Sequence, residues 1–311
     1  MPRNPVGAPA GKSRKGSKME CLPRIDLHTH SDYSDGRATI FDIVREAEKK
    51  KLRLLAISDH FDPNDPKVTR RGLTMVSLSP YVDDINQARD NTKNVKILAS
   101  IEANIIASRD NTTYLSLPID VDWKSLKERG LDFVQAGVHY IKHPIVEQIS
   151  EETWKTSKVR KRVPSEILNV EYWESYKLAL LKTIENPMVS IITHVEGYLP
   201  MPPFEIYISN IIGLNRKREI EKSIVTKFFD EEWKRTIIEK ASACGKAFEL
   251  HVPTRTPTQD FIRLCLKEGA KLSVGTDAHS LGQVGDVAWA IRLLNRLGAK
   301  RKDIIFNELI D

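Results

Sequence analysis

The chain has 311 residues, of which 41% are apolar and 29% are charged, so it is long enough for one large domain or two small ones with a buried core. No run approaches the roughly 18 apolar residues that a membrane helix needs, which excludes a membrane-spanning protein. The three cysteines, Cys21, Cys244 and Cys265, form no Cys-x-x-Cys pair. This excludes a disulfide scaffold or a zinc ribbon and indicates the reducing cytoplasm.

The net charge of +6 is concentrated at the N-terminus. Five positive charges lie within residues 1–19, at Arg3, Lys12, Arg14, Lys15 and Lys18. The same segment is rich in Pro, Gly, Ala and Ser and cannot bury apolar surface. We therefore predict a disordered basic tail over residues 1–20 and a single domain over residues 21–311.

From Arg24 onward, short β-branched or apolar runs alternate with longer segments of helical period, which is the pattern of parallel β/α folds. The predicted strands are Arg24–Leu27, Arg53–Ile57, Val95–Ile101, Leu131–Ala136, Met188–Ile192, Lys246–Leu250 and Lys271–Val274. The predicted helices are Thr39–Lys51, Tyr81–Asp90, Ser165–Ile184, Glu231–Ala243, Gln259–Glu268 and Val284–Leu297. Seven β/α units in series favour a closed α/β barrel over an open sheet.

Boundary residues support these elements. Thr39 and Ser79 are typical N-caps, and Gly130, Gly245 and Gly269 stand where the chain turns back into a strand. Three long connections interrupt the alternation, at Asn104–Asp122, Tyr140–Val163 and Pro200–Lys227. Connections of this length are often lids or binding loops.

Potential metal ligands follow every predicted strand. Seven of the eight histidines lie at strand ends, accompanied there by carboxylates. Barrel enzymes carry their chemistry at this edge. Within an extended segment His28 and His30 point the same way, as do Asp277 and His279, so each pair can bind one cluster. Imidazole and carboxylate without thiolate suit catalytic zinc, manganese or iron rather than a structural metal.

Six motifs, taken together, resemble the PHP (polymerase and histidinol phosphatase) family of metal-dependent phosphoesterases. They are His28-Thr29-His30 with Ser34-Asp35-Gly36, Ile57-Ser58-Asp59-His60, Ile101-Glu102-Ala103-Asn104, Gly137-Val138-His139, Thr193-His194 and Gly275-Thr276-Asp277-Ala278-His279. They span residues 24 to about 285. The resemblance implies a distorted seven-stranded (β/α) barrel, TIM-like and of the PHP type, which agrees with the strands predicted independently.

The resemblance also implies a site for up to three divalent metal ions, Zn, Mn or Fe. By this assignment His28, His30, Glu102 and Asp277 surround the first ion. Glu102 bridges to a second ion held by His139 and His194, and Asp35, His60 and His279 hold a third. Some relatives carry histidine at the Asp35 position, which leaves the identity of the third ion open.

The chemistry expected of such a site is hydrolysis of a phosphate ester. A hydroxide bridging the metal ions would attack phosphorus directly, since closely spaced ions lower the pKa of bound water and clamp both oxygens of an in-line displacement. His139 and Asp277 are expected to be essential, and Arg255 follows a strand where relatives present an arginine to the phosphate. The predicted substrate is a small phosphomonoester such as histidinol phosphate, a sugar phosphate or a nucleotide.

Two alternatives stay open. The cationic cluster Lys155–Arg162, together with the basic tail, is compatible with a nuclease acting on nucleic acid ends or with a solvated surface. A non-catalytic scaffold subunit is disfavoured because every ligand position is filled. The oligomeric state is not predicted.

Other polar residues at the strand ends receive weaker predictions. Asp26 and Asp59 either orient ligand histidines or face solvent. Glu249 and His251 are expected at the rim of the site, with a structural role favoured for His251. His143 is assigned no role.

Overall fold

A computed structural model describes residues 22–61, 72–108, 113–115, 122–142, 170–200 and 214–310. The predicted tail at residues 1–20 and the basic cluster at residues 155–162 lie outside these ranges. So does His143.

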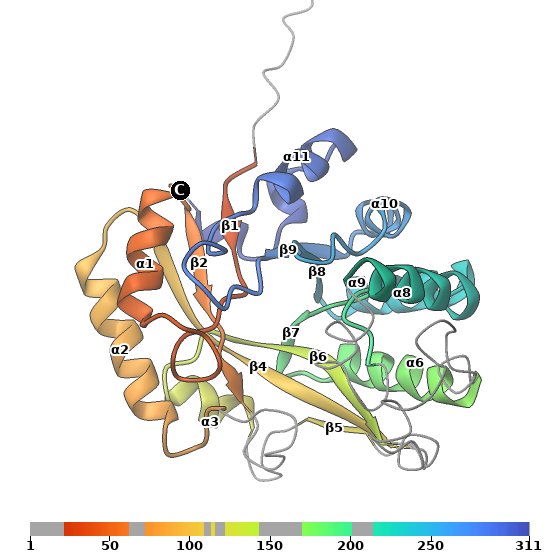
Figure 1. Ribbon diagram of the computed structural model, residues 1–311, viewed down its shortest axis with the longest axis horizontal. Coiled ribbons are helices and arrows are strands. Elements are labelled where there is room, and N and C mark those ends of the chain that lie inside the picture. Colours follow the sequence, from red (N-terminus) through yellow and green to blue (C-terminus); the bar gives the residue numbers. More distant parts are fainter. Residues whose placement is uncertain are drawn as a thin grey trace, which may run out of the picture.

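The strands of the described chain form one sheet (Figure 1). They are β1 (Ile25–Asp26), β2 (Leu54–Ile57), β3 (His60–Phe61), β4 (Lys96–Ser108), β5 (Thr113–Leu115), β6 (Phe133–Lys142), β7 (Val189–Ile192), β8 (Ala247–His251) and β9 (Lys271–Gly275). Seven of them run in the order β1-β2-β4-β6-β7-β8-β9, and every neighbouring pair is parallel. The two short strands β3 and β5 pair only with β4.

The ends of this order approach each other. Leu27 N donates to Val274 O at 2.8 Å and His30 N donates to Ala278 O at 2.9 Å, which joins the β1 side to the β9 side. The sheet is therefore a nearly closed seven-stranded barrel, and the predicted fold class is confirmed. Closure here brings His28 and His30 beside Asp277 and His279, although some 250 residues separate them in the sequence.

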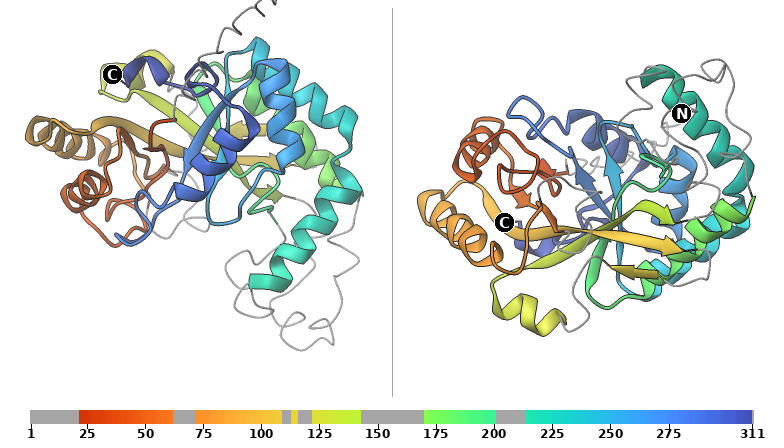
Figure 2. Two further views of the ribbon diagram at one scale, coloured as in Figure 1. Left: turned by 90° about the horizontal axis from the view of Figure 1, so that it is seen from above. Right: turned by 60° about the horizontal axis from the view of Figure 1, so that its bottom comes forward.

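Helices surround the sheet, as the two further views show (Figure 2). They are α1 (Ile40–Lys49), α2 (Leu78–Asn91), α3 (Trp123–Glu128), α6 (Val170–Glu185), α8 (Leu214–Phe228), α9 (Glu231–Ala243), α10 (Gln259–Glu268) and α11 (Ala288–Leu297), followed by short 3₁₀ turns at Arg301–Asp303 and Asn307–Leu309. No described helix is long and apolar enough to cross a membrane.

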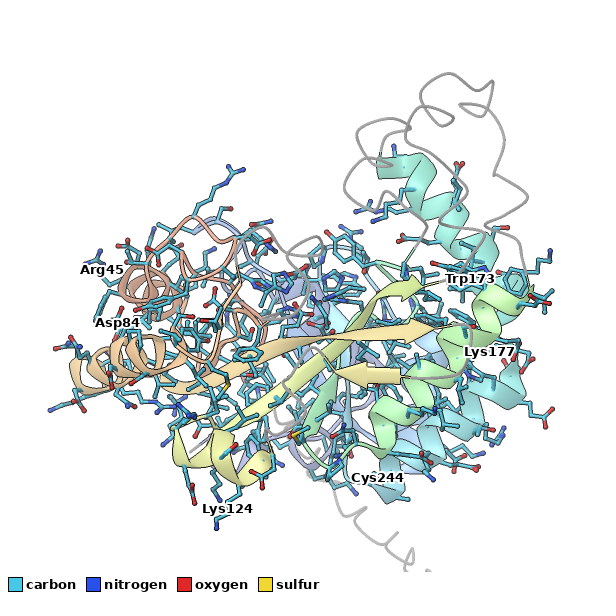
Figure 3. All side chains as sticks on the ribbon, turned by 90° about the horizontal axis from the view of Figure 1, so that it is seen from below. Arg45, Asp84, Lys124, Trp173, Lys177 and Cys244 are labelled. Atoms are coloured by element: carbon cyan, nitrogen blue, oxygen red, sulfur yellow. The ribbon has the colours of Figure 1, made fainter. Side chains whose placement is uncertain are left out.

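Aromatic packing holds the helices on one side together. Trp173 of α6 is fully buried and stacks on Phe228 with ring centroids 6.1 Å apart, while Tyr176 stacks on Phe229 at 5.2 Å (Figure 3). Aromatic side chains bury large areas at low entropic cost, so this cluster fixes α6 against the end of α8.

The predicted boundaries are mostly confirmed. Thr39 caps α1 by accepting from Asp42 N, and Gly130, Gly245 and Gly269 have the positive φ values that these turns require. The Ser79 prediction is wrong, because α2 begins at Leu78 and its N-cap residue is Ser77, whose side chain makes no capping bond.

Two helices and two strand extensions were not predicted. α3 begins directly after the predicted connection Asn104–Asp122, where no helix was expected, and α8 occupies half of the predicted insertion Pro200–Lys227. β4 and β6 run past their predicted ends to Ser108 and Lys142, paired with each other as far as these residues. Asn104 consequently lies within a strand rather than at the start of a loop.

A truncation on α9 tests the packing of this layer. Ile238 is fully buried and Glu239, its neighbour, is exposed. We expect Ile238→Ala to lower the free energy of unfolding by about 2–5 kcal/mol through lost burial and a residual cavity. Glu239→Ala should stay within about 0.5 kcal/mol. Urea denaturation of both variants measures the difference, and equal effects would contradict the assigned packing.

Candidate metal centre

The nine side chains predicted as ligands converge at the carboxyl end of the barrel. Glu102 and His139 lie within the long strands β4 and β6, and the other seven come from the short strand β3 or from the connections after β1, β7 and β9. Together the nine form several groups. They include His30 with Asp35, His60 and His279; His28 with His30 and Asp277; and Glu102 with His139 and His194. Two further groups are His28 with His194 and Glu249, and His194 with His251 and Asp277. Within each group the candidate ligand atoms all lie within 4.8 Å of one another. The geometry thus brings all nine together.

Glu102 of β4 lies at the centre of the cluster and is fully buried. Its Oε1 is 3.4 Å from His139 Nε2 and 3.3 Å from His194 Nε2. Its Oε2 is 3.2 Å from His28 Nε2 and 3.1 Å from His60 Nδ1. One carboxylate therefore faces two separate sets of imidazoles, which is the arrangement of a bridging ligand.

Several buried polar atoms of this cluster have no hydrogen-bond partner in the described structure. They are His28 Nε2, both ring nitrogens of His30, His60 Nδ1, His194 Nε2 and Glu102 Oε2. Leaving a buried donor or acceptor unpaired costs about 1–3 kcal/mol, and native proteins rarely tolerate several in one place. Atoms that converge on common points without mutual hydrogen bonds are explained by cations between them, so the residues fit a divalent metal site.

The electrostatics agree with this interpretation. Burial opposes ionisation of Glu102, but His28 and the other imidazoles around it hold its pKa well below the usual range. Burial lowers the pKa of His60 to about 3, with the neighbouring His30 adding to the effect. At neutral pH the Glu102 carboxylate is therefore ionised and the His60 imidazole uncharged, which are the protonation states that bind metal. At His28 and His279 burial lowers the pKa, but the neighbouring carboxylates outweigh it and raise the pKa, to about 9 for His279, so these two ligands would lose a proton when an ion binds.

Residues outside the predicted set hold the ligands in place. Glu249 Oε1 is 2.8 Å from His28 Nδ1, and Glu249 Oε2 accepts from His194 N at 3.1 Å. Asn104 Oδ1 bonds to His139 Nδ1. Such contacts fix the orientation of a ligating ring. Glu249 is 1% exposed and lies under the ligands, so its predicted place at the rim is wrong.

Asp26 and Asp59 are both fully buried, so neither faces solvent. Asp26 accepts from Thr276 N, Thr276 Oγ1 and Gly285 N, and burial raises its pKa to about 6. Asp59 accepts from Ser31 N and Ser31 Oγ. Both carboxylates therefore fix the backbone that carries ligands rather than orienting a histidine ring directly.

Two positions pack too closely for a side chain. A Cβ on Gly137 would lie 2.9 Å from His194 Nδ1, and one on Gly275 would lie 2.6 Å from His28 Cβ and overlap Glu249 Oε1. The ligand residues His194 and Asp277 themselves have positive φ values of 57° and 47°. Backbone strain of this kind is usually found at functional sites.

Arg255 follows β8 and is exposed, with φ 59° in a turn closed by its N–H donating to His251 O at 2.9 Å. His251, the last residue of β8, is fully buried and its Nε2 lies 3.3 Å from Asp277 Oδ2.

Comparison with known proteins identifies relatives of this architecture. Residues 26–241 match the model of the PHP domain. A protein named as a probable phosphatase in Caldanaerobacter subterraneus is 27% identical over 306 residues, covering 94% of this chain and 91% of that protein.

The fold is also similar to that of the histidinol phosphate phosphatase of Lactococcus lactis, which was solved in complex with zinc, L-histidinol and phosphate. The TM-score is 0.54 and the sequence identity 19%, and the alignment covers 89% of this chain and 95% of that chain. The DNA polymerase/3'-5' exonuclease PolX of Bacillus subtilis is 23% identical over 90% of this chain but only 38% of its own length.

The close approach at Gly275 gives a first test of the site. We expect Gly275→Ala to displace Glu249 and His28, to destabilise the protein by about 1–3 kcal/mol, and to lower its metal content. Gly282→Ala, in the same connection, meets nothing within 4 Å and serves as the control. Thermal unfolding and elemental analysis of both variants are the measurements. A Gly275→Ala protein indistinguishable from the control would contradict this geometry.

The central place of Glu102 gives a second test. Glu102→Ala removes a group shared by two sets of imidazoles, whereas Asp35→Ala removes a half-exposed group that belongs to a single set. We expect the first variant to lose about two metal ions per chain and the second about one. Elemental analysis after loading with zinc or manganese measures both, and equal losses would show that Glu102 does not bridge.

Proposed function

We propose that this chain, which belongs to the PHP domain family, is a metal-dependent phosphoesterase that hydrolyses a small phosphomonoester. The observation that carries the proposal is the group of buried, unpartnered imidazole and carboxylate atoms at the barrel end. The probable phosphatases among its relatives cover nearly the whole chain and support the same reaction class.

The ions would be held by the nine predicted ligands. In the proposed assignment Glu102 joins His28, His30 and Asp277 on one side to His139 and His194 on the other, while Asp35, His60 and His279 bind the third ion. Zinc, manganese or iron suits this donor set. When bound, such ions supply Lewis acidity and a nucleophilic hydroxide at neutral pH.

The chain itself supplies orientation and charge. Glu249 and Asn104 hold the His28 and His139 rings, so that the Nε2 atoms of both rings face the Glu102 carboxylate. Three ligand carboxylates do not neutralise three divalent ions, so the loaded site favours an anion. Arg255, exposed on the neighbouring turn, is proposed to bind a phosphate oxygen through its guanidinium.

A small phosphorylated substrate is supported by the Lactococcus lactis structure, which contains histidinol and phosphate. We therefore retain histidinol phosphate, sugar phosphates and nucleotides as the proposed substrate class. The cytoplasm remains the proposed location, in keeping with the free thiols of Cys244 and Cys265.

The nuclease alternative depended on the basic tail and the cluster at residues 155–162, which lie outside the described residues.

The reaction class can be tested directly. We expect the purified protein with manganese or zinc to release phosphate from at least one of histidinol phosphate, sugar phosphates and nucleotides. His139→Ala and Asp277→Ala should each lower kcat/KM by about 10³-fold or more, because each removes a proposed ligand. Arg255→Ala should mainly raise KM.

The control is Asp260→Asn, a substitution of an exposed residue in the first turn of α10, which should retain wild-type activity. Full activity in either ligand variant would contradict the assigned site. Cleavage of single-stranded oligonucleotide with no release from any monoester would replace the phosphatase proposal by the nuclease one.

A further inference from the structure

His251 ends β8 and is completely buried against the metal centre, but it is not one of the nine proposed ligands. Its ring lies 5.0 Å from the His194 ring, centroid to centroid, in an edge-to-face arrangement. Both ring nitrogens have polar neighbours, one on the ligand side and one on the opposite side. The imidazole therefore links the cluster to the turn behind it.

On the ligand side, the two oxygens of Asp277 face different partners. Asp277 Oδ1 lies 2.9 Å from His30 Nε2, 3.6 Å from His28 Nε2 and 3.7 Å from His279 Nδ1. Asp277 Oδ2 lies 3.3 Å from His251 Nε2. One oxygen is thus directed among His28, His30 and His279 and the other at His251, and Asp277 also forms a possible metal-binding group with His194 and His251.

On the opposite side, a pair of hydroxyl groups faces the ring. His251 Nδ1 is 2.7 Å from Thr254 Oγ1, which is 2.7 Å from Thr256 Oγ1. A Cβ at Gly197 would lie 2.6 Å from Thr254 Oγ1, so the backbone of the β7 connection packs directly onto these hydroxyls. Thr254 Oγ1 can accept from Thr256 Oγ1 and donate to Nδ1, and in that arrangement the ring proton lies on Nε2.

We propose that His251 is a positioning residue for Asp277. Its Nε2–H donates to Asp277 Oδ2, so the carboxylate presents only Oδ1 to a metal ion. Thr254 holds the ring in the tautomer that makes this donation. The inference concerns how a ligand is held, and its test measures metal binding without any substrate, so a failure to find hydrolysis would leave the test intact.

The hydrogen bond has a physical consequence for the ion. A carboxylate whose second oxygen is engaged does not rotate freely and binds through one oxygen, which suits the low coordination number of zinc. Outer partners of this kind typically contribute 10–100-fold in metal affinity. Loss of the donor should therefore weaken zinc binding without removing any ligand atom.

The experiment compares two substitutions of His251 in the full chain. His251→Leu fills the space but removes the donor, whereas the amide nitrogen of His251→Gln can take the place of imidazole Nε2. We expect the dissociation constant for zinc, measured by competition with a chromophoric chelator, to rise about 10–100-fold in the Leu variant. In the Gln variant it should stay within about threefold of wild type.

A matched pair at Thr254 tests the other side of the ring. Thr254→Val removes the hydroxyl with little change in shape, and Thr254→Ser keeps it. The Val variant should bind zinc more weakly than wild type, and the Ser variant should bind zinc like wild type. If His251→Leu does not fold, this pair alone tests whether the His251 ring positions Asp277. Wild-type affinity in both His251→Leu and Thr254→Val would overturn the proposal. Equal loss in the Leu and Gln variants would do so as well, and would indicate that His251 binds the ion itself.

Discussion

The burial of Glu102 among imidazoles is the constraint on which the rest of the site depends. A carboxylate removed from water is stable only if cations or hydrogen bonds replace its hydration. Here Thr193 Oγ1 donates one hydrogen bond to Glu102 Oε1 at 3.1 Å, and Oε2 has no described hydrogen-bond partner. The nitrogens His28 Nε2, His60 Nδ1 and His194 Nε2, which face the two oxygens, have no hydrogen-bond partner either. Divalent cations would supply the missing partners, so we expect metal binding to stabilise the native structure.

The barrel makes that burial possible. Because seven parallel strands run toward one edge, residues of the long strands β4 and β6 and of the connections after β1, β7 and β9 can meet there. The connections are then held by groups below the ligands: Asp26 fixes Thr276 beside Asp277, and Asp59 fixes Ser31 beside His30. The positive φ values at His194 and Asp277 show that the surrounding structure holds the backbone in the left-handed region, which residues other than glycine disfavour.

Much of this could be predicted from the sequence, and the failures have physical causes. The seven barrel strands follow from local pattern, and the rule that barrel chemistry lies at strand ends brings histidines and acids to one edge. The choice of nine ligands among them came from the resemblance to the PHP family. α8 was missed because its surface is highly charged. Its buried residues Ile220, Ile224 and Phe228 nevertheless recur at intervals of four, which is a helical signal. The parts of two predicted connections that extend β4 and β6, at residues 104–108 and 140–142, were missed because they pair with each other across some 34 residues of sequence.

The positions of Glu249 and His251 were predicted wrongly for a different reason, because the alternation of side chains along the strand already indicated where these two point. They are two residues apart in a strand, so their side chains lie on the same face, by the same reasoning that paired His28 with His30. That face is the inside of the barrel end, where a buried acid and imidazole need polar partners. Their partners lie in the connections that follow β1 and β9. Glu249 contacts His28 after β1, and His251 contacts Asp277 after β9. The contact of His251 with Asp277 follows from the direct pairing of β8 with β9, whereas Glu249 meets His28 only because the barrel closes between β9 and β1. Both depend on long-range pairing, which no local pattern in the sequence contains.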